Sequence, residues 1–302
     1  MFVRQLHYLV AVAREAHFGR AADACHVSQP TLSSGIRKLE EELGLPLVIR
    51  GHRFLGLTEQ GERVLLWAQR IVADYDGLKQ ELSGSGAGLS GVLRIGAIPA
   101  ALPALPPLVN AFCARHPQVR VQIQSMPSAA IQRGLDELEI DAGVTYLDNE
   151  PLSRVRTTLL YDESYAFVTC APWFSGRDTI TWAEAADCPL CLLTRDMQNR
   201  RIIDQIFAEA GIVSNPRIEV NSFEGVWSII CSGAWGGIVP SSHAEVFGQM
   251  EGLQVLPLID PVRTQPVGLV ISDRDPASPV ATALMRHAPR REAISVRAPA
   301  LT

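Results

Sequence analysis

The sequence predicts an α/β protein that begins with a small helical domain, and three observations indicate this class. Apolar residues recur at helical spacing through the N-terminal segment. From residue 92 onward, short apolar runs alternate with helical patterns, which is typical of sheets flanked by helices. Between the two, residues 83–91 are rich in Gly and Ser and indicate a hinge. A chain of 302 residues is long enough for two or more domains with separate cores.

Composition and the first residues exclude several classes of protein. The chain is 47% hydrophobic with a net charge of −5, as expected of a folded globular protein. Only one cation, Arg4, precedes the apolar stretch that begins at Leu6, and Arg14 and Glu15 interrupt that stretch, which argues against a signal peptide. No apolar run approaches the roughly 18 residues of a membrane span. We therefore expect a cytoplasmic protein that does not enter a membrane.

The first helical pattern ends before a short second helix, which we expect to follow a break at Gly19. A third helix starts at Ser28, a good N-cap, with Pro30 tolerated in its first turn. Residues 45–58 then form two short apolar runs around a basic, Gly-containing turn, which predicts a β-hairpin or wing. A buried stripe is expected along the third helix at Leu32, Ile36, Leu39 and Leu43.

The outward face of this third helix changes character along its length. Its first two turns are uncharged or basic, and Glu40, Glu41 and Glu42 follow. Because phosphates repel glutamates, the pattern predicts a helix-turn-helix whose third helix enters the DNA groove by its N-terminal half. Residues 1–58 carry seven basic and five acidic residues, net +2, which agrees with this. The alternative is an ordinary capped surface helix. Gly35 weakens the helix, and close backbone packing is a possible gain.

A long helix is expected at 59–82, capped by Thr58, with apolar residues at alternating steps of four and three. Such a seam favours pairing with a second helix, and the alternative is a helix lying on its own domain. The residues of this seam are Val64, Ala68, Ile71, Tyr75 and Leu78.

The rest of the chain predicts two α/β lobes of parallel strands and flanking helices, with a ligand site between them. The expected strands are 92–98, 119–126, 141–147, 165–170, 190–194, 217–220, 236–240 and 266–273, and the expected helices are 105–116, 128–140, 197–211, 222–233 and 281–287.

The stretch "AADACHVSQPTLSSGIRKLEEELGLPLVIRGHRFLGLTEQGE" resembles the winged helix-turn-helix of LysR-type transcriptional regulators, and the linker helix, hinge and two lobes follow in that family's order. The resemblance implies an effector domain with a periplasmic-binding-protein-like fold. It also implies a cytoplasmic homodimer, or a dimer of dimers (a homotetramer), that binds double-stranded promoter DNA. RNA polymerase is a further partner that the resemblance suggests. The domains it implies are 1–58 (DNA-binding), 59–82 (linker helix), 83–91 (hinge) and 92–302 (effector-binding), with lobe I at about 92–161 and 267–302 and lobe II at about 162–266.

The resemblance also assigns site residues. The DNA-reading positions are Ser28, Gln29, Pro30, Thr31, Ser33, Ser34 and Arg37, with Arg50, His52 and Arg53 at the wing. The effector positions are Pro99, Ala100, Ala101, Ser128, Tyr146, Thr194, Met197, Gln198 and Asn199. Helix N-termini facing one crevice would suit a small anionic metabolite. The alternative for Ser128 and Asn199 is that they merely cap their helices.

One departure from the family and one further resemblance bear on the effector. Many family members carry Ser or Thr where Ala100 stands, so one hydroxyl contact is missing. The stretch "DMQNRRIID" faintly resembles regulators found beside formate dehydrogenase operons, which would make formate or a related small carboxylate the effector.

Other functions are weighed against this one. The cysteines are scattered, as expected of reduced thiols, but Cys188 and Cys191 have the CxxC spacing of a metal or redox pair. A solute-binding protein would share the two lobes but should have an export signal and no head domain. We expect no cofactor, no metal and no enzymatic activity, because no nucleophile, metal-ligand or phosphate-loop pattern is present.

Overall fold

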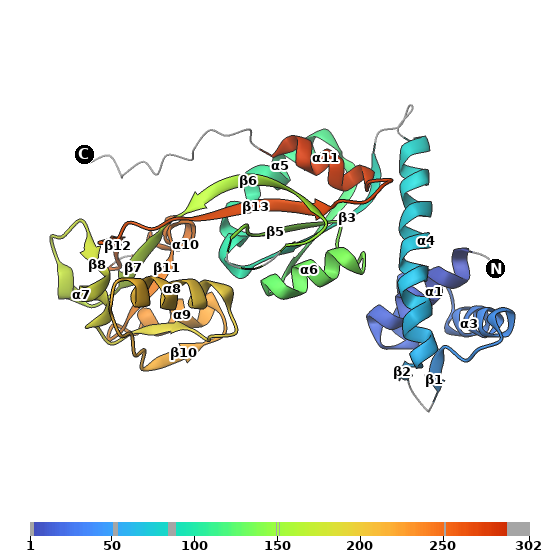
Figure 1. Ribbon diagram of the computed structural model, residues 1–302, viewed down its shortest axis with the longest axis horizontal. Helices are drawn as coiled ribbons and strands as arrows, with labels where there is room; N and C mark the ends of the chain where they lie inside the picture. Colours follow the sequence, from blue (N-terminus) through green and yellow to red (C-terminus); the bar gives the residue numbers. More distant parts are fainter. Residues whose placement is uncertain are drawn as a thin grey trace.

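The chain is arranged as a head domain, a long helix and two lobes in a row (Figure 1). The computed structural model describes residues 3–50, 54–83, 89–148, 150, 152–250 and 252–288. Within these residues, no helix is long and apolar enough to cross a membrane. The head comprises α1 (Val3–Glu15), α2 (Phe18–Ala24), α3 (Gln29–Leu43) and an antiparallel hairpin of β1 (Val48–Arg50) and β2 (Phe54–Leu57).

The head packs its three helices around one apolar core. Leu32, Ile36 and Leu39 of α3 are fully buried, as the predicted stripe requires. Leu43 is 38% exposed, so the prediction was wrong there: α3 ends at this residue and Gly44, with a φ of 70°, turns the chain away. The expected break at Gly19 was also wrong, since α2 begins at Phe18 and the ring of His17 caps it.

Helix α4 (Glu59–Ser83) leaves the head as the longest helix of the described chain. Thr58 caps it: its Oγ1 accepts from the Gly61 N–H at 2.9 Å and donates to the Pro46 carbonyl at 2.7 Å. The predicted cap is therefore confirmed. Beyond α4, the chain enters lobe I at β3 (Ser90–Ala97), two residues earlier than expected.

Lobe I is a five-stranded sheet in the order β4-β3-β5-β13-β6, with α5 and α11 on one face and α6 on the other (Figure 1). Only the β4-β3-β5 part is parallel, because β6 and β13 are the strands on which the chain leaves and re-enters the lobe, and both pair antiparallel. The prediction of a parallel sheet was therefore wrong for β13, and β6 was not predicted as a strand. The remaining elements are the 3₁₀ helix η1 (Pro99–Ala104), α5 (Pro106–Arg115), β4 (Gln118–Ser125), α6 (Ser128–Asp136), β5 (Ala142–Tyr146), β6 (Val155–Glu163), β13 (Gln265–Ser272) and α11 (Pro279–His287).

Lobe II is likewise mixed, with a four-stranded sheet β11-β7-β12-β8 beside the parallel pair β10-β9. Helix α6 of lobe I ends four residues earlier than expected, whereas α8 and α9 of lobe II match within a few residues. The other two helices of lobe II, α7 and α10, were not predicted. Lobe II comprises β7 (Tyr165–Thr169), η2 (Pro172–Phe174), β8 (Ile180–Thr181), α7 (Trp182–Ala186), β9 (Cys191–Leu193), α8 (Gln198–Glu209), β10 (Ile218–Val220), α9 (Phe223–Ile230), β11 (Gly236–Pro240), α10 (Ser241–Phe247) and β12 (Gln254–Ile259).

Candidate functional site

The N-terminal half of α3 presents a polar surface to solvent. The Ser28 hydroxyl caps the helix, accepting from the Thr31 N–H at 3.3 Å and sharing a 2.8 Å hydrogen bond with its hydroxyl. Ser33 is half-buried, and the other reading positions of the helix are exposed: Ser28, Gln29, Pro30, Thr31, Ser34 and Arg37. All seven therefore lie at one end of a helix whose opposite side is anchored in the core.

The acidic half of α3 is used differently from the prediction at one position. Glu40 does not simply mark the end of a DNA-facing surface, because its Oε1 accepts from the backbone N–H groups of Leu47 and Val48, at 2.9 and 3.1 Å. This carboxylate therefore ties the recognition helix to the first strand of the hairpin.

At the wing, Arg50 ends β1, while its side chain and the whole of His52 and Arg53 lie outside the described residues.

Between the lobes, the structure brings together most of the predicted effector residues around a cleft of about 20 Å³. Ala101 and Thr194 are not among the lining residues: Ala101 is fully buried in lobe I, and the Thr194 N–H donates to the Val220 carbonyl. The predicted residues at the cleft are Pro99, Ala100, Ser128, Tyr146, Met197, Gln198 and Asn199, joined by Ile98, Pro127, Leu193 and Phe223.

Neither Ser128 nor Asn199 caps its helix, so the alternative explanation of these residues was wrong. The N-cap residues are Pro127 and Met197, and neither helix has a side-chain cap. Ser128 instead donates its hydroxyl hydrogen to Glu150, while the Asn199 amide donates to the Tyr146 hydroxyl at 3.0 Å. Both polar side chains are therefore turned toward the gap between the lobes.

A buried carboxyl group lies behind the cleft, and sequence patterns gave no indication of it. Glu163, at the end of β6, accepts from the Tyr146 hydroxyl at 2.5 Å and from the Tyr161 hydroxyl at 3.2 Å. Burial raises the pKa of Glu163 to about 8, and the two hydroxyl hydrogen bonds lower it by less. The carboxyl group is therefore mostly protonated at neutral pH. A chain of hydrogen bonds runs from Asn199 in lobe II through Tyr146 to this group.

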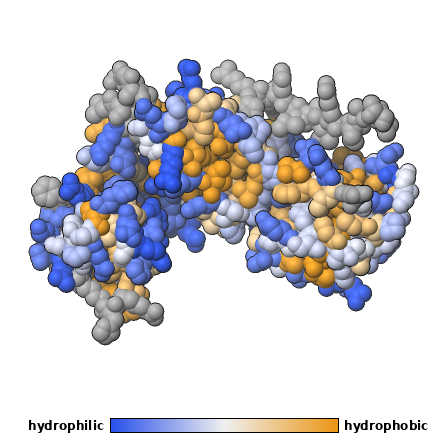
Figure 2. Space-filling model, turned by 180° about the vertical axis from the view of Figure 1, so that it is seen from behind, coloured by the Kyte–Doolittle hydropathy of each residue, from blue (hydrophilic) through white to orange (hydrophobic). Residues whose placement is uncertain are grey.

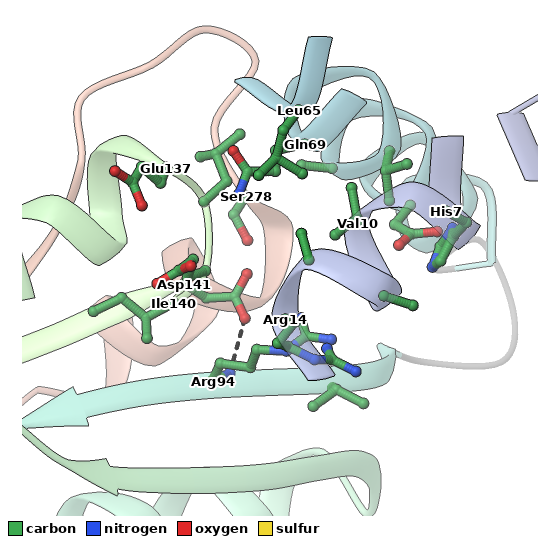
Figure 3. Close-up of a pocket in the computed structure, with 18 of the residues that line it drawn as sticks. His7, Val10, Arg14, Leu65, Gln69, Arg94, Glu137, Ile140, Asp141 and Ser278 are labelled. Carbon is green, nitrogen blue, oxygen red and sulfur yellow. Dashed lines mark hydrogen bonds between the residues drawn. The ribbon is translucent and has the colours of Figure 1, made fainter. Parts of the chain in front are cut away.

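A second, much larger cavity of about 1030 Å³ lies between the head, α4 and lobe I (Figure 3). His7 and Arg14 line it from the head, Gln69 from α4, and Arg94 and Asp141 from lobe I. The Arg94 N–H donates to the Asp141 carboxylate at 2.8 Å. The walls of this cavity belong to different domains and carry both signs of charge. We therefore interpret it as a gap left between the domains and not as a ligand site.

Comparison with known proteins decides the family. The family described as "Bacterial regulatory helix-turn-helix protein, lysR family" matches residues 3–62, and "LysR substrate binding domain" matches residues 86–292. The chain belongs to the LysR family of transcription regulators. It is thus a DNA-binding regulator with an N-terminal helix-turn-helix domain and an effector-binding domain of periplasmic-binding-protein-like fold.

Relatives of this LysR-type regulator match along most of its length. It is 31% identical to the "DNA-binding transcriptional dual regulator OxyR" of Escherichia coli K12, over 98% of this chain and 96% of that protein. It is 30% identical to the "HTH-type transcriptional regulator IlvY" of the same organism, over 80% and 82% of the two chains.

Solved structures of the same architecture agree. A full-length OxyR variant from Pseudomonas aeruginosa superposes with a TM-score of 0.75 at 28% identity, covering 95% of this chain and 93% of that one. Full-length CbnR complexed with its target DNA gives a TM-score of 0.69 at 22% identity, covering 95% and 99%, and this match supports the fold.

The CxxC pair of this regulator has the properties of structural thiols. Burial raises the pKa of both Cys188 and Cys191 to about 11, and the Cys188 thiol donates to the Glu184 carbonyl at 3.4 Å. No cluster of His, Cys, Asp and Glu suited to a metal occurs in the part of the chain that the structure describes. Since the thiolate is the reactive and metal-binding form, this pair is poorly suited to either chemistry near neutral pH.

Proposed function

We propose that this regulator reads promoter DNA with the N-terminal half of α3 and changes its activity when a small carboxylate binds between the lobes. The observation that carries the first part is the exposed polar end of α3, held by a buried stripe on its other side. Ser, Thr and Gln side chains can reach base edges and phosphates, and Arg37 can donate a bidentate pair of hydrogen bonds to guanine. We place its action in the cytoplasm, as a homodimer or dimer of dimers that can contact RNA polymerase.

Replacing Arg37 tests the DNA-reading surface. With a fragment from upstream of its own gene, Arg37→Ala should weaken specific binding by about 1–3 kcal/mol in fluorescence anisotropy at fixed salt. Arg115→Ala removes the same charge from an exposed position on lobe I and is the matched control. Equal affinities of the two variants would contradict the assigned role of Arg37.

The effector half of the proposal is supported by the polar groups that meet at the cleft. Ser128 begins α6, where free backbone N–H groups favour an anion, and the amides of Gln198 and Asn199 face it from α8 of lobe II. A ligand held by both lobes favours one lobe arrangement, and it shifts the equilibrium by its differential affinity for the two states. Formate is the candidate that the sequence resemblance suggests, and other small carboxylates are tested beside it.

A thermal-shift screen of small carboxylate salts against sodium chloride of equal ionic strength tests this. The unfolding temperature of the wild-type protein should rise with a carboxylate effector. Asn199→Ala and Ser128→Ala should lose that rise while keeping DNA affinity. An unaltered dose response in both variants would place the ligand elsewhere.

A second candidate function is a thiol switch. The thiols of Cys170, which follows β7, and Cys231, an exposed residue after α9, lie close enough for Cys231 to influence the pKa of Cys170. A relative from Escherichia coli O6:H1 at 31% identity is named "Hydrogen peroxide-inducible genes activator". In the reaction, the Cys231 thiolate attacks a peroxide oxygen, which gives a sulfenic acid and, after protonation, water. The Cys170 sulfur then displaces a second water, so two thiols and H₂O₂ yield one disulfide and two waters.

Peptide mapping under non-reducing conditions tests the switch. Hydrogen peroxide should produce a peptide that links Cys170 to Cys231, and Cys188→Ser should form it as the wild-type protein does. Peroxide treatment that leaves these two cysteines reduced would exclude this second function.

A further inference from the structure

A carboxylate of the protein, that of Glu150, is bonded to Ser128, one of the residues that line the interlobe cleft. Glu150 lies between β5 and β6, and both strands belong to the sheet of lobe I. Its Oε2 accepts the hydroxyl hydrogen of Ser128 at the start of α6, and its Oε1 is paired with the guanidinium of Arg201 on α8 of lobe II. One side chain therefore joins the anion-binding end of one lobe to a cation of the other.

Further hydrogen bonds surround this carboxylate on both sides. The Arg201 guanidinium also donates to the carbonyl groups of Arg195 and Asp196, at 3.1 and 2.6 Å, which fixes it at the start of α8. On the other side, the Gln132 amide of α6 makes two hydrogen bonds with the backbone of Ser153, three residues after Glu150, at 3.0 and 3.1 Å. These bonds do not involve the Glu150 side chain, so its carboxylate can leave Ser128 and Arg201 without breaking them.

The cleft beside this bridge is small, and two of the polar groups that line it lack a hydrogen-bond partner. Its volume of about 20 Å³ has room for about one water molecule. Gln198 and Asn199 line it, are 6% and 5% exposed, and have amide oxygens without a hydrogen-bond partner among the described residues. A buried acceptor without a donor is costly, so these oxygens call for a ligand that supplies an N–H or O–H group.

We propose that Glu150 is an internal substitute for the effector's carboxylate. This inference rests on the proposed function, because it concerns the same cleft. In the structure, the Glu150 carboxylate is bonded to Ser128 and to Arg201, and it links the two lobes when no effector is bound. The effector displaces it, takes over both contacts with its own carboxylate, and offers a donor to Gln198 and Asn199. Its class is thus a small carboxylate with a neighbouring hydroxyl or amine.

Competition by Glu150 has a measurable consequence. The apparent affinity of a ligand falls by the fraction of molecules whose site is free. If Glu150 occupies the site in nine molecules out of ten or more, its removal improves the apparent dissociation constant at least about tenfold. Acetate is the fitting probe, because Glu150→Ala removes a CH₂–COO⁻ group of the same size.

The test is acetate binding to the full-length protein, followed by calorimetry and by thermal shift against sodium chloride of equal ionic strength. Glu150→Ala should bind acetate at least about tenfold more tightly than the wild-type protein, and Ser128→Ala in the same chain should abolish the gain. Glu139→Ala is the matched control. It removes an exposed carboxylate three residues after the end of α6, and it should bind acetate as the wild-type protein does.

Equal acetate binding by Glu150→Ala and Glu139→Ala would overturn the inference. That result would leave the proposed function standing if the wild-type protein still responds to a carboxylate through Asn199. Conversely, a gain in Glu150→Ala supports the inference even where the wild-type protein responds to no carboxylate, which would contradict the proposed effector class alone.

Discussion

Gly35 shows how one missing side chain sets the distance between two helices of the head. A Cβ atom at this position would lie 2.6 Å from Cδ2 of Tyr8, a buried residue of α1. The glycine weakens α3 by roughly 0.5–1 kcal/mol relative to alanine, and close packing against the ring is the gain that the sequence left open.

We therefore expect Gly35→Ala to destabilise the head by about 1–3 kcal/mol, because overpacking outweighs the improved helix propensity. Chemical denaturation followed by circular dichroism measures this. Gly77→Ala in α4 is the matched control, since its Cβ would meet only Pro279 at 3.8 Å, and it should be neutral or stabilising. Equal stability of the two variants would show that the Tyr8 ring moves aside freely.

Glu163 makes the stability of the lobes depend on pH. Its pKa is raised by burial to about 8, above the usual 4.5, so the folded state binds its proton more tightly than the unfolded state. Between pH 4.5 and 8, the free energy of unfolding from this group therefore falls as pH rises, by up to about 1.4 kcal/mol per pH unit. Above this range the contribution levels off.

Glu163→Gln keeps the shape and removes the titration, so its unfolding temperature should fall less steeply between about pH 6 and 8 than that of the wild-type protein. Differential scanning fluorimetry across this range measures the two slopes. Since all other groups are shared, their difference isolates residue 163. Parallel slopes would mean that the carboxyl group is ionised in the folded protein.

At the scale of elements, α4 has apolar residues on two sides: one side packs against the head, and the other is exposed. Ala68 is fully buried in the core of the head, and Val64 and Ile71 pack against that core, so this part of the predicted seam faces its own domain. Tyr75 and Leu78 are 40% and 52% exposed. Trp67 is 65% exposed and was not part of the predicted seam. At 100° per residue, it lies within about 80° of both Tyr75 and Leu78 around the helix axis, and so on the same side.

We expect Trp67, Tyr75 and Leu78 to be the part of α4 that pairs with a second chain. Leu78→Glu should weaken dimers, because it places a charge in that contact, and analytical ultracentrifugation over a range of concentrations measures the change. Leu66→Glu makes the same substitution at a position 49% exposed but about 120° away around the helix. A dimer that survives Leu78→Glu but not Leu66→Glu would reassign the paired face.

The elements also show what a single sequence can predict. Local signals located the helix-turn-helix and the strands of lobe I that precede helices, because caps and periodicity are properties of neighbouring residues. β6 was missed, since Thr157, Thr158 and Asp162 give it no clean alternation. The roles of Glu150 and Glu163 were missed for another reason: each depends on partners from other elements, which no local pattern contains.

At the scale of the whole molecule, two separate cores are joined by a narrow connection. The buried residues of the head form one cluster and those of both lobes form another. Between them, Arg274 of lobe I pairs with Asp74 of α4 at 3.0 Å, and a partly exposed pair of this kind contributes at most about 1 kcal/mol. Figure 2 shows apolar surface gathered over the middle of the molecule, where lobe I lies, which is a surface that further subunits can cover.

Separate cores predict that the head and the lobes unfold separately. Calorimetry of the full chain should show two transitions, because the energy that couples the domains is small beside the stability of each. Gly35→Ala should lower the transition of the head alone, and Glu163→Gln should change the pH dependence of the other alone. If both variants instead moved one common transition, the domains would be rigidly coupled. An effector signal would then reach the DNA through a fixed body. Two transitions would instead agree with a signal carried by rearrangement of the subunits about α4.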